Sequence, residues 1–184
     1  VGGYSLGARI GAVLLARHPR LFAGAVFVGA RLGLTDSRER EARRQLDARH
    51  AATLRRDGLS VFIDSWEKQT LFETQRALPP ELLEAQRAIR GLHDPEGLAR
   101  SLEVLGLSSM PSEPTSMASS RVTLMTGERD SKFRDLAARI AADHGGLRLV
   151  SVEGAGHNLL LEAPDAVARE MSRIASDTSA GDSP

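Results

Sequence analysis

Three residue types that together can activate a hydroxyl group occur in one order along this chain: Ser5, Asp130 and His157. Ser5 lies in the run Gly-Tyr-Ser-Leu-Gly at residues 3–7, a pattern typical of a serine held on a tight turn between a strand and a helix. A serine hydroxyl is a poor nucleophile or base at neutral pH, and it becomes useful when an imidazole accepts its proton and a carboxylate orients that imidazole. We therefore predict a catalytic triad of these three residues.

The residues around the serine extend this prediction. The backbone N–H of Leu6 would lie at the N-terminus of the following helix, where it can donate to a developing oxyanion. We expect Gly3 and Gly7 to lie so close to neighbouring backbone that a Cβ atom would clash. We also expect the chain to begin partway through a larger fold, because only four residues precede Ser5 and a supporting strand needs roughly five.

Asp130 and His157 each have a simpler interpretation, as a helix cap and as a solvated loop residue. Their positions argue against it, because each directly follows a predicted strand, at residues 121–127 and 147–152. The remaining histidines lie on predicted helices or helix ends and are interpreted as structural: His18, His50, His93 and His144.

Strands and helices must position these side chains, and the two ends of the chain alternate between them. The predicted strands cover residues 25–30, 121–127 and 147–152. The predicted helices cover residues 6–17, 133–143 and 164–174. A continuously apolar run such as 25–30 is typical of a parallel strand buried on both faces. The alternation therefore predicts an α/β fold, with a parallel sheet and flanking helices.

A run of helices interrupts this alternation. A charged helix is predicted from Asp36 to Asp57, ended by Gly58, with its apolar stripe at Ala42, Leu46, His50 and Leu54. Further helices are predicted at residues 59–66, 81–90 and 95–106. The run is too long for an ordinary connection, and we predict that it forms a helical lid over the sheet.

The chain then has four predicted parts. Residues 1–35 hold the serine turn, its helix and the next strand, and residues 36–107 form the lid. Residues 108–175 complete the core with the acid and histidine loops, beginning with a serine-rich loop that ends at residue 120. Residues 176–184 are polar and are predicted to be a disordered tail.

The composition excludes several classes of function. The chain has 184 residues, 41% of them hydrophobic, which is enough for a sizeable core. Its 24 basic and 24 acidic residues balance, so no global charge draws it to nucleic acid or to a membrane surface. It has no cysteine, which excludes disulfides and thiolate metal sites, and no apolar run approaches the ~20 residues of a membrane span. We expect a cytoplasmic protein without nucleic-acid or membrane partners, and the oligomeric state stays open.

Three motifs together resemble one family. They are Gly-Tyr-Ser-Leu-Gly-Ala-Arg at residues 3–9, Gly-Glu-Arg-Asp-Ser-Lys-Phe at 127–133 and Gly-Ala-Gly-His-Asn at 154–158. They are similar to the 2-succinyl-6-hydroxy-2,4-cyclohexadiene-1-carboxylate synthases of menaquinone and phylloquinone biosynthesis, and the resemblance runs from residue 1 to about Ile174. It implies the C-terminal portion of an alpha/beta hydrolase fold with an inserted helical lid, and a plastid location if the source is a photosynthetic eukaryote.

The resemblance also implies an activity and a site. The family eliminates pyruvate from a carboxylated cyclohexene, with the triad making the serine a base, and we expect no cofactor and no metal. The implied ligand is a small-molecule polycarboxylate, held by residues that match the family's substrate contacts: Tyr4, Arg9, Arg43, Trp66 and Arg90. Arg44 and Arg87 are alternatives to the two lid arginines. Glu67 and Met110 depart from the family, which usually has an aromatic residue and a glutamine there.

Other interpretations remain beside the lyase. The lid arginines Arg43 and Arg90 could be surface charge, and Trp66 could be core packing. A serine ester or C–C bond hydrolase would use the same triad with Ser5 as a covalent nucleophile. From another class, this chain by itself could be an inactive fragment or an interaction module, and we expect residues 1–184 alone to be inactive.

Overall fold

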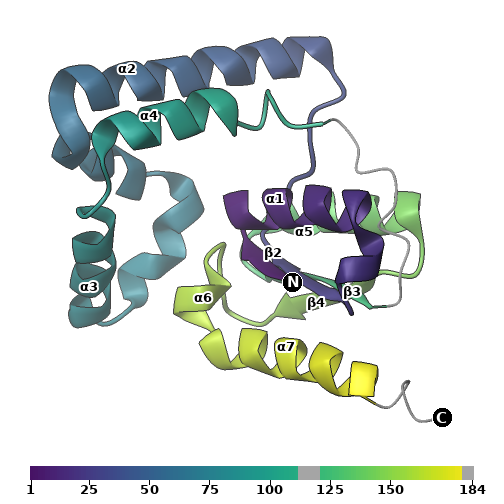
Figure 1. Ribbon diagram of the computed structural model, residues 1–184. Helices are drawn as coiled ribbons and strands as arrows, with labels where there is room; N and C mark the ends of the chain where they lie inside the picture. The colour runs from purple at the N-terminus through teal and green to yellow at the C-terminus, as the bar shows by residue number, and fades with distance from the viewer. Residues whose placement is uncertain (112–120, 180–184) are drawn as a thin grey trace. The chain divides into compact units, whose positions relative to one another are not determined.

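The computed structural model describes residues 1–111 and 121–179, and the chain divides into two compact units (Figure 1). The first unit comprises Val1–Arg31 and Pro114–Pro184, and the second comprises Leu32–Glu113. The first contains a parallel sheet with flanking helices, and the second is helical. The α/β fold class predicted from the alternation is confirmed.

Among the described residues the sheet has four strands, in the order in which they follow along the chain, and every neighbouring pair is parallel. They are β1 (Gly2–Tyr4), β2 (Ala25–Val28), β3 (Val122–Gly127) and β4 (Arg148–Val152). Every residue of β2 and of β3 is buried, as expected of parallel strands covered on both faces. Because all four strands run the same way, the segments that follow them meet at one edge of the sheet.

Helices cover both faces of this sheet. The first unit contains α1 (Leu6–Arg17), the short 3-10 helix η1 (Pro19–Leu21), α5 (Ser131–His144), α6 (Leu159–Glu162) and α7 (Pro164–Ser179). In Figure 1, α1 and α5 lie on one face and α7 lies on the other. Successive residues of β2 alternate accordingly, since Phe27 meets Gly11 of α1, while Val26 and Val28 belong to a core cluster with Ile174 of α7.

The helix limits in this unit agree with the prediction in one case and extend beyond it in others. The helix after Ser5 runs over the predicted residues 6–17 and ends before Pro19. The final helix continues to Ser179, so residues 176–179 are helical and were wrongly assigned to a disordered tail. Residues 180–184 of that tail, and 112–120 of the serine-rich loop, lie outside the described residues.

The second unit consists of α2 (Ser37–Glu67), the 3-10 helix η2 (Thr70–Ala77), α3 (Pro80–Arg90) and α4 (Pro95–Val104). Gly58 breaks α2 as predicted, with a φ of 85° and a ψ of 173° that suit glycine. The side chains of Asp36 and Asp94 cap the N-termini of α2 and α4 by accepting from Glu39 N and Gly97 N. η2 was not predicted.

The apolar stripe predicted for α2 is wrong in its first half. Ala42 and Leu46 are exposed, and the buried positions are instead Asp47, Ala51 and Leu54. Asp47 is only 2% exposed, and its two carboxylate oxygens accept from Nε of Arg43, each at 2.9 Å. Asp47, whose charge is paired with Arg43, is therefore the buried residue, and not the neighbouring Leu46 that the spacing of apolar residues predicted.

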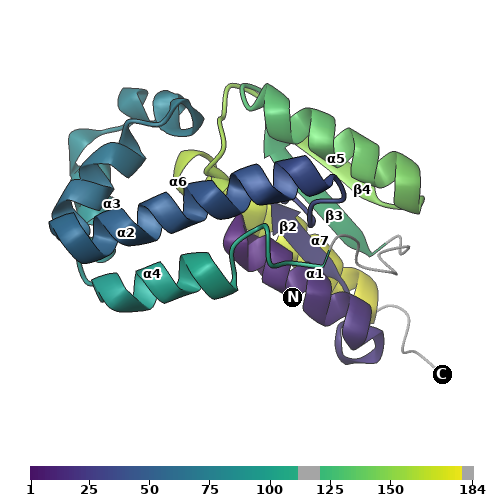
Figure 2. The ribbon, with the colours of Figure 1, turned by 90° about the horizontal axis from the view of Figure 1, so that it is seen from above.

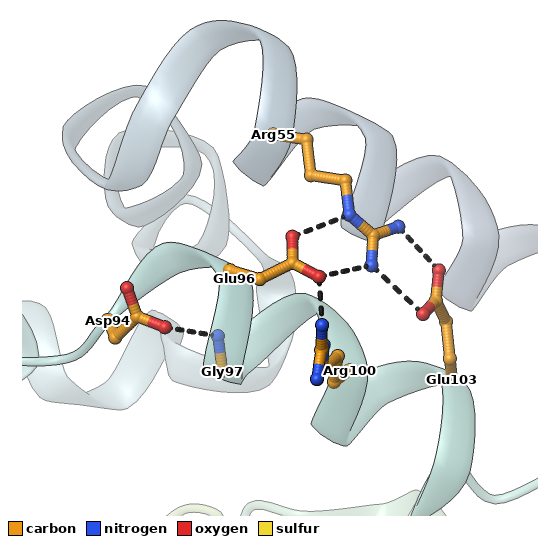
Figure 3. A network of polar contacts seen from close by, with 6 residues as sticks. All are labelled: Arg55, Asp94, Glu96, Gly97, Arg100 and Glu103. Atoms are coloured by element: carbon orange, nitrogen blue, oxygen red, sulfur yellow. Dashed lines mark hydrogen bonds and ion pairs between the residues drawn. The ribbon is translucent and has the colours of Figure 1, made fainter.

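α2 and α4 lie side by side (Figure 1 and Figure 2) and are joined by an ion-pair network. Arg55 of α2 donates to both oxygens of Glu96 and of Glu103 on α4, and Glu96 also accepts from Arg100 (Figure 3). The hydrogen bonds from Arg55 and Arg100 lower the pKa of Glu96 to about 2.

Among the described residues, no helix combines the length and hydropathy needed to cross a membrane.

Candidate active site

Ser5 sits on a strained turn between β1 and α1. Its φ of 49° and ψ of −108° make it the only non-glycine residue with a positive φ among those described. Its N–H donates to the carbonyl of Val28 at 2.9 Å, which continues the β1–β2 ladder by one residue, and α1 begins at Leu6. Such a conformation costs of order 1–3 kcal/mol and is found where the surrounding structure over-determines it, often at active sites. The local geometry is that of the predicted nucleophile turn.

Of the two glycines in this turn, only one is explained by close packing. A Cβ on Gly3 would lie 2.5 Å from the carbonyl carbon and oxygen of Gly7 and 2.6 Å from N of Ala8. The predicted clash at Gly3 is therefore confirmed. A Cβ on Gly7 would meet nothing within 4 Å among the described residues, so the same prediction for Gly7 is wrong.

Asp130 has two hydrogen-bonding roles. Its Oδ1 accepts from N of Phe133 at 3.3 Å and caps α5, while its Oδ2 lies 2.7 Å from Nδ1 of His157. The cap and the triad acid were weighed as alternatives, and the structure contains both contacts. The Asp130 and His157 side chains are only 7% and 1% exposed, so an ionised Asp130 favours the tautomer with the proton on Nδ1. Nε2 of His157 is then the basic nitrogen.

His157 reaches from the loop after β4 across the carboxyl edge of the sheet. Its ring lies 4.3 Å from that of Phe133 and 5.3 Å from that of Tyr4, the residue before Ser5, measured between centroids. A Cβ on Gly29, which follows β2 and has a φ of 55°, would lie 2.6 Å from Cε1 of His157. Glycine at this position therefore leaves room for the imidazole, and His157 is a buried residue beside the serine turn, not a solvated loop residue.

Two carboxylates that were not predicted hold the histidine loop. Glu162 of α6 accepts from N of Gly156 at 2.7 Å and from N of Asn158 at 3.1 Å, the residues on either side of His157. Glu128 accepts from N of Gly154 at 2.9 Å. Glu162 lies one helical turn beyond Asn158, and this spacing is the only signal in the sequence that could have indicated its contact.

Leu6 and Arg9 lie on the first turn of α1. The first N–H groups of a helix have no partner within it, so the N–H of Leu6 is available in principle to an anion above Ser5. N of Arg9 donates to the carbonyl of Ser5 at 3.2 Å, which places Arg9 one turn from the serine. Among the described residues there is no group of histidine, aspartate and glutamate side chains that could hold a metal ion.

The other predicted contacts lie in the second unit. Arg43 is oriented by the buried Asp47, whereas the alternative Arg44 forms an exposed pair with Glu41. Trp66 stacks on Phe62 with ring centroids 5.4 Å apart, at the margin of a core cluster.

Arg90 and its alternative Arg87 share one partner. Arg90 Nη1 donates to Oε1 of Glu67 at 2.7 Å, and Arg87 Nη1 donates to Oε2 of Glu67 at 2.7 Å. Arg43 and Arg90 thus each form an ion pair with a carboxylate of this unit, and Trp66 contacts other aromatic rings. The substrate-binding roles of these three residues stay predictions.

Relatives of this chain with curated names include synthases. The 2-succinyl-6-hydroxy-2,4-cyclohexadiene-1-carboxylate synthase of Citrobacter koseri is 34% identical over 174 residues, covering 94% of this chain and 66% of that protein. The protein of the same name from Salmonella arizonae is 33% identical over the same shares. The chain therefore spans just under two thirds of the length of these relatives.

Solved structures agree on the fold. The structure of MenH from S. aureus matches with a TM-score of 0.87 at 23% identity, covering 97% of this chain and 68% of that one. A thermophilic esterase from Thermogutta terrifontis matches with a TM-score of 0.73 at 20% identity, covering 96% and 64%. Residues 1–170 match the sequence model of the alpha/beta hydrolase family. With this match over most of its length, the chain belongs to the alpha/beta hydrolase family.

Proposed function

We propose that the protein carrying this chain is a carbon–oxygen lyase that eliminates pyruvate from a carboxylated cyclohexene intermediate of menaquinone or phylloquinone biosynthesis. The names of its curated relatives suggest the reaction, at 34% and 33% identity over 94% of the chain. The observation that carries the proposal is the buried Asp130–His157 hydrogen bond of 2.7 Å, with His157 beside the Ser5 turn. A serine that acts as a base requires both the oriented histidine and its position beside the serine.

In this mechanism Ser5 removes a proton from a ring carbon as His157 Nε2 takes the proton of the serine hydroxyl. The electron pair of the broken C–H bond enters the ring as a double bond, and the C–O bond to the leaving group breaks with its electrons on the leaving oxygen, which gives the enolate of pyruvate. The enolate takes a proton at carbon from the His157 imidazolium, so that pyruvate is released and the triad returns to its starting state. Asp130 stabilises the imidazolium that forms, and the N–H of Leu6 donates to developing negative charge on the substrate. The chemistry needs no cofactor.

Arginines suit the carboxylates of such a substrate, because the planar guanidinium binds a carboxylate through two parallel hydrogen bonds. Arg9 lies one turn from Ser5, and Arg43 is oriented through Nε by Asp47. We assign Arg9, Arg43 and Arg90 to the substrate carboxylates, with Tyr4 and Trp66 as further contacts, and we propose that residues 36–107 act as a lid.

The test is release of pyruvate from the expected substrate by the purified full gene product, followed with lactate dehydrogenase. Asn caps helices about as well as Asp, so D130N should keep the fold. It should lower kcat by about 10⁴-fold, because a neutral amide neither fixes the tautomer nor stabilises the imidazolium. Absence of pyruvate release with normal turnover of simple esters would overturn the proposal.

The second candidate is a serine ester or C–C bond hydrolase. The strained turn at Ser5 favours it, since such a turn exposes a nucleophile, and the fold is shared with esterases. A hydrolase would accumulate an acyl group on Ser5 when rapidly quenched with an activated ester, whereas the proposed lyase would not. The same two assays on residues 1–184 alone test the expectation that this chain by itself is inactive.

A further inference from the structure

Glu67 uses both of its carboxylate oxygens to bind the two arginines of α3. Oε1 accepts from Arg90 Nη1 and Oε2 accepts from Arg87 Nη1, each at 2.7 Å. Arg87 also donates to Asp64, one turn before Glu67 on α2. The Glu67 carboxylate therefore occupies the guanidinium edges in the way that an anionic ligand would.

The four charges of this cluster cancel. Arg87 and Arg90 contribute two cations, and Asp64 and Glu67 contribute two carboxylates. The hydrogen bonds to Asp64 and Glu67 raise the pKa of Arg87 above its usual value, because the two carboxylates stabilise its cation. An incoming carboxylate consequently meets arginines whose charge an internal carboxylate already balances.

Arg90 is the more enclosed of the two arginines. Its side chain is 21% exposed, against 43% for Arg87. Its guanidinium carbon lies 5.6 Å from the centre of the Phe72 ring, and that ring is 6.1 Å from the ring of Trp66. Glu67 thus caps a partly desolvated cation that stands beside an aromatic cluster, and the contact is more than an exposed surface pair.

We propose that Glu67 is a specificity-determining residue, which occupies on Arg90 the place of a ligand carboxylate and competes with it. Polycarboxylates bind by displacing Glu67, and this competition weakens binding at that arginine. The inference rests on the proposed function in one respect, that a substrate carboxylate meets Arg90. The opposing view is that Glu67 only ties α2 to α3.

The two views differ in the sign of one measurement. Glu67→Gln removes the competing charge, so a carboxylate should bind about fivefold more tightly, the effect of one like charge at contact distance in water and the lower limit for this partly buried pair. If Glu67 only ties α2 to α3, the same substitution should leave carboxylate binding unchanged or weaken it, because a loosened α3 no longer positions the arginines. Glu67→Phe supplies the same charge removal with an aromatic side chain, should the glutamine variant fail to fold.

The experiment is calorimetric titration of the full gene product with tricarballylate, a small tricarboxylate. Glu103→Gln is the matched control, since it removes a carboxylate from another arginine pair between helices of this unit. Tighter binding in E67Q or E67F, unchanged binding in E103Q, and loss of the gain in E67Q/R90Q support the proposal. Unchanged or weaker binding in both Glu67 variants overturns it.

A second readout separates this inference from the proposed function. In the pyruvate assay, E67Q should lower KM about fivefold with kcat unchanged. If no pyruvate is released but tricarballylate binds more tightly to E67Q, the proposed lyase fails and the competition stands. If pyruvate is released and both Glu67 variants leave KM and tricarballylate binding unchanged or weaker, the lyase stands and the competition fails.

Discussion

The position of His157 should depend on Glu162, a residue outside the predicted triad. The Glu162 carboxylate accepts from N of Gly156 and from N of Asn158, at 2.7 and 3.1 Å, and so fixes the backbone on both sides of the histidine. Glu162→Ala removes both acceptors. Glu162→Gln keeps one oxygen but turns an NH₂ group towards the other N–H, which leaves that donor without an acceptor.

The magnitudes follow from these two contacts. A hydrogen bond to a charged group contributes about 1.5–3 kcal/mol to stability. Since Glu162 is only partly buried, we take the lower end and expect E162A to lose about 3 kcal/mol and E162Q about half of that. Misplacing a catalytic group by about 1 Å costs roughly 100-fold in rate. We therefore expect kcat to fall by about 10- to 100-fold in E162A.

The assays are urea unfolding for stability and pyruvate release, or ester hydrolysis, for activity, at a temperature where each variant is folded. Glu170→Ala serves as the control, because the Glu170 carboxylate also accepts hydrogen bonds, but from Arg148 and Arg173, away from the histidine loop. E170A should change stability with little effect on kcat. Normal kcat in E162A, or an equal loss in E170A, would refute the view that Glu162 positions the histidine.

Two further predictions concern the serine turn and the helical unit. Gly3→Ala should destabilise the protein by about 1–3 kcal/mol through its backbone clash, whereas Gly7→Ala, in the first turn of α1, should be neutral or stabilise it by up to about 1 kcal/mol; equal urea midpoints of the two variants would contradict this. Because the pKa of Glu96 is lowered to about 2 by Arg55 and Arg100, its contribution to stability should be present above its ordinary pKa of 4.5 and lost as the pH falls toward 2. E96Q should flatten this part of the stability–pH curve, and 1 M salt should weaken the effect in the wild type; an unchanged curve in E96Q would show that other carboxylates cause it.

The sequence predicted best where a local signal decides the structure. The helix after Ser5 has its observed limits because a strand-to-helix turn starts it and Pro19 ends it, and Gly58 breaks α2 through its own backbone preference. The triad order placed Asp130 and His157 after two parallel strands, and parallel strands bring such residues to one edge.

The sequence failed where contacts between distant segments decide. The buried face of α2 was assigned to Leu46, yet Asp47 is buried because Arg43 satisfies its charge. Gly7 looked like Gly3 in the motif, but only a structure can tell which Cβ would meet backbone. The hydrogen bond from N of Gly154 to the Glu128 carboxylate joins residues 26 apart in the sequence, and no periodic pattern indicates it.

Which arginine of α3 binds a ligand was open in the sequence, and the physical environment now favours one of them. Both Arg87 and Arg90 contact Glu67 at the same distance, so distance does not discriminate. Arg90 has half the exposed fraction of Arg87, and its guanidinium lies over Phe72. An ion pair with a carboxylate strengthens as water is excluded. Arg87 also has Asp64 as a second carboxylate partner in this unit. When Glu67 is displaced, Arg87 therefore stays neutralised, and Arg90 is the cation left for the incoming carboxylate.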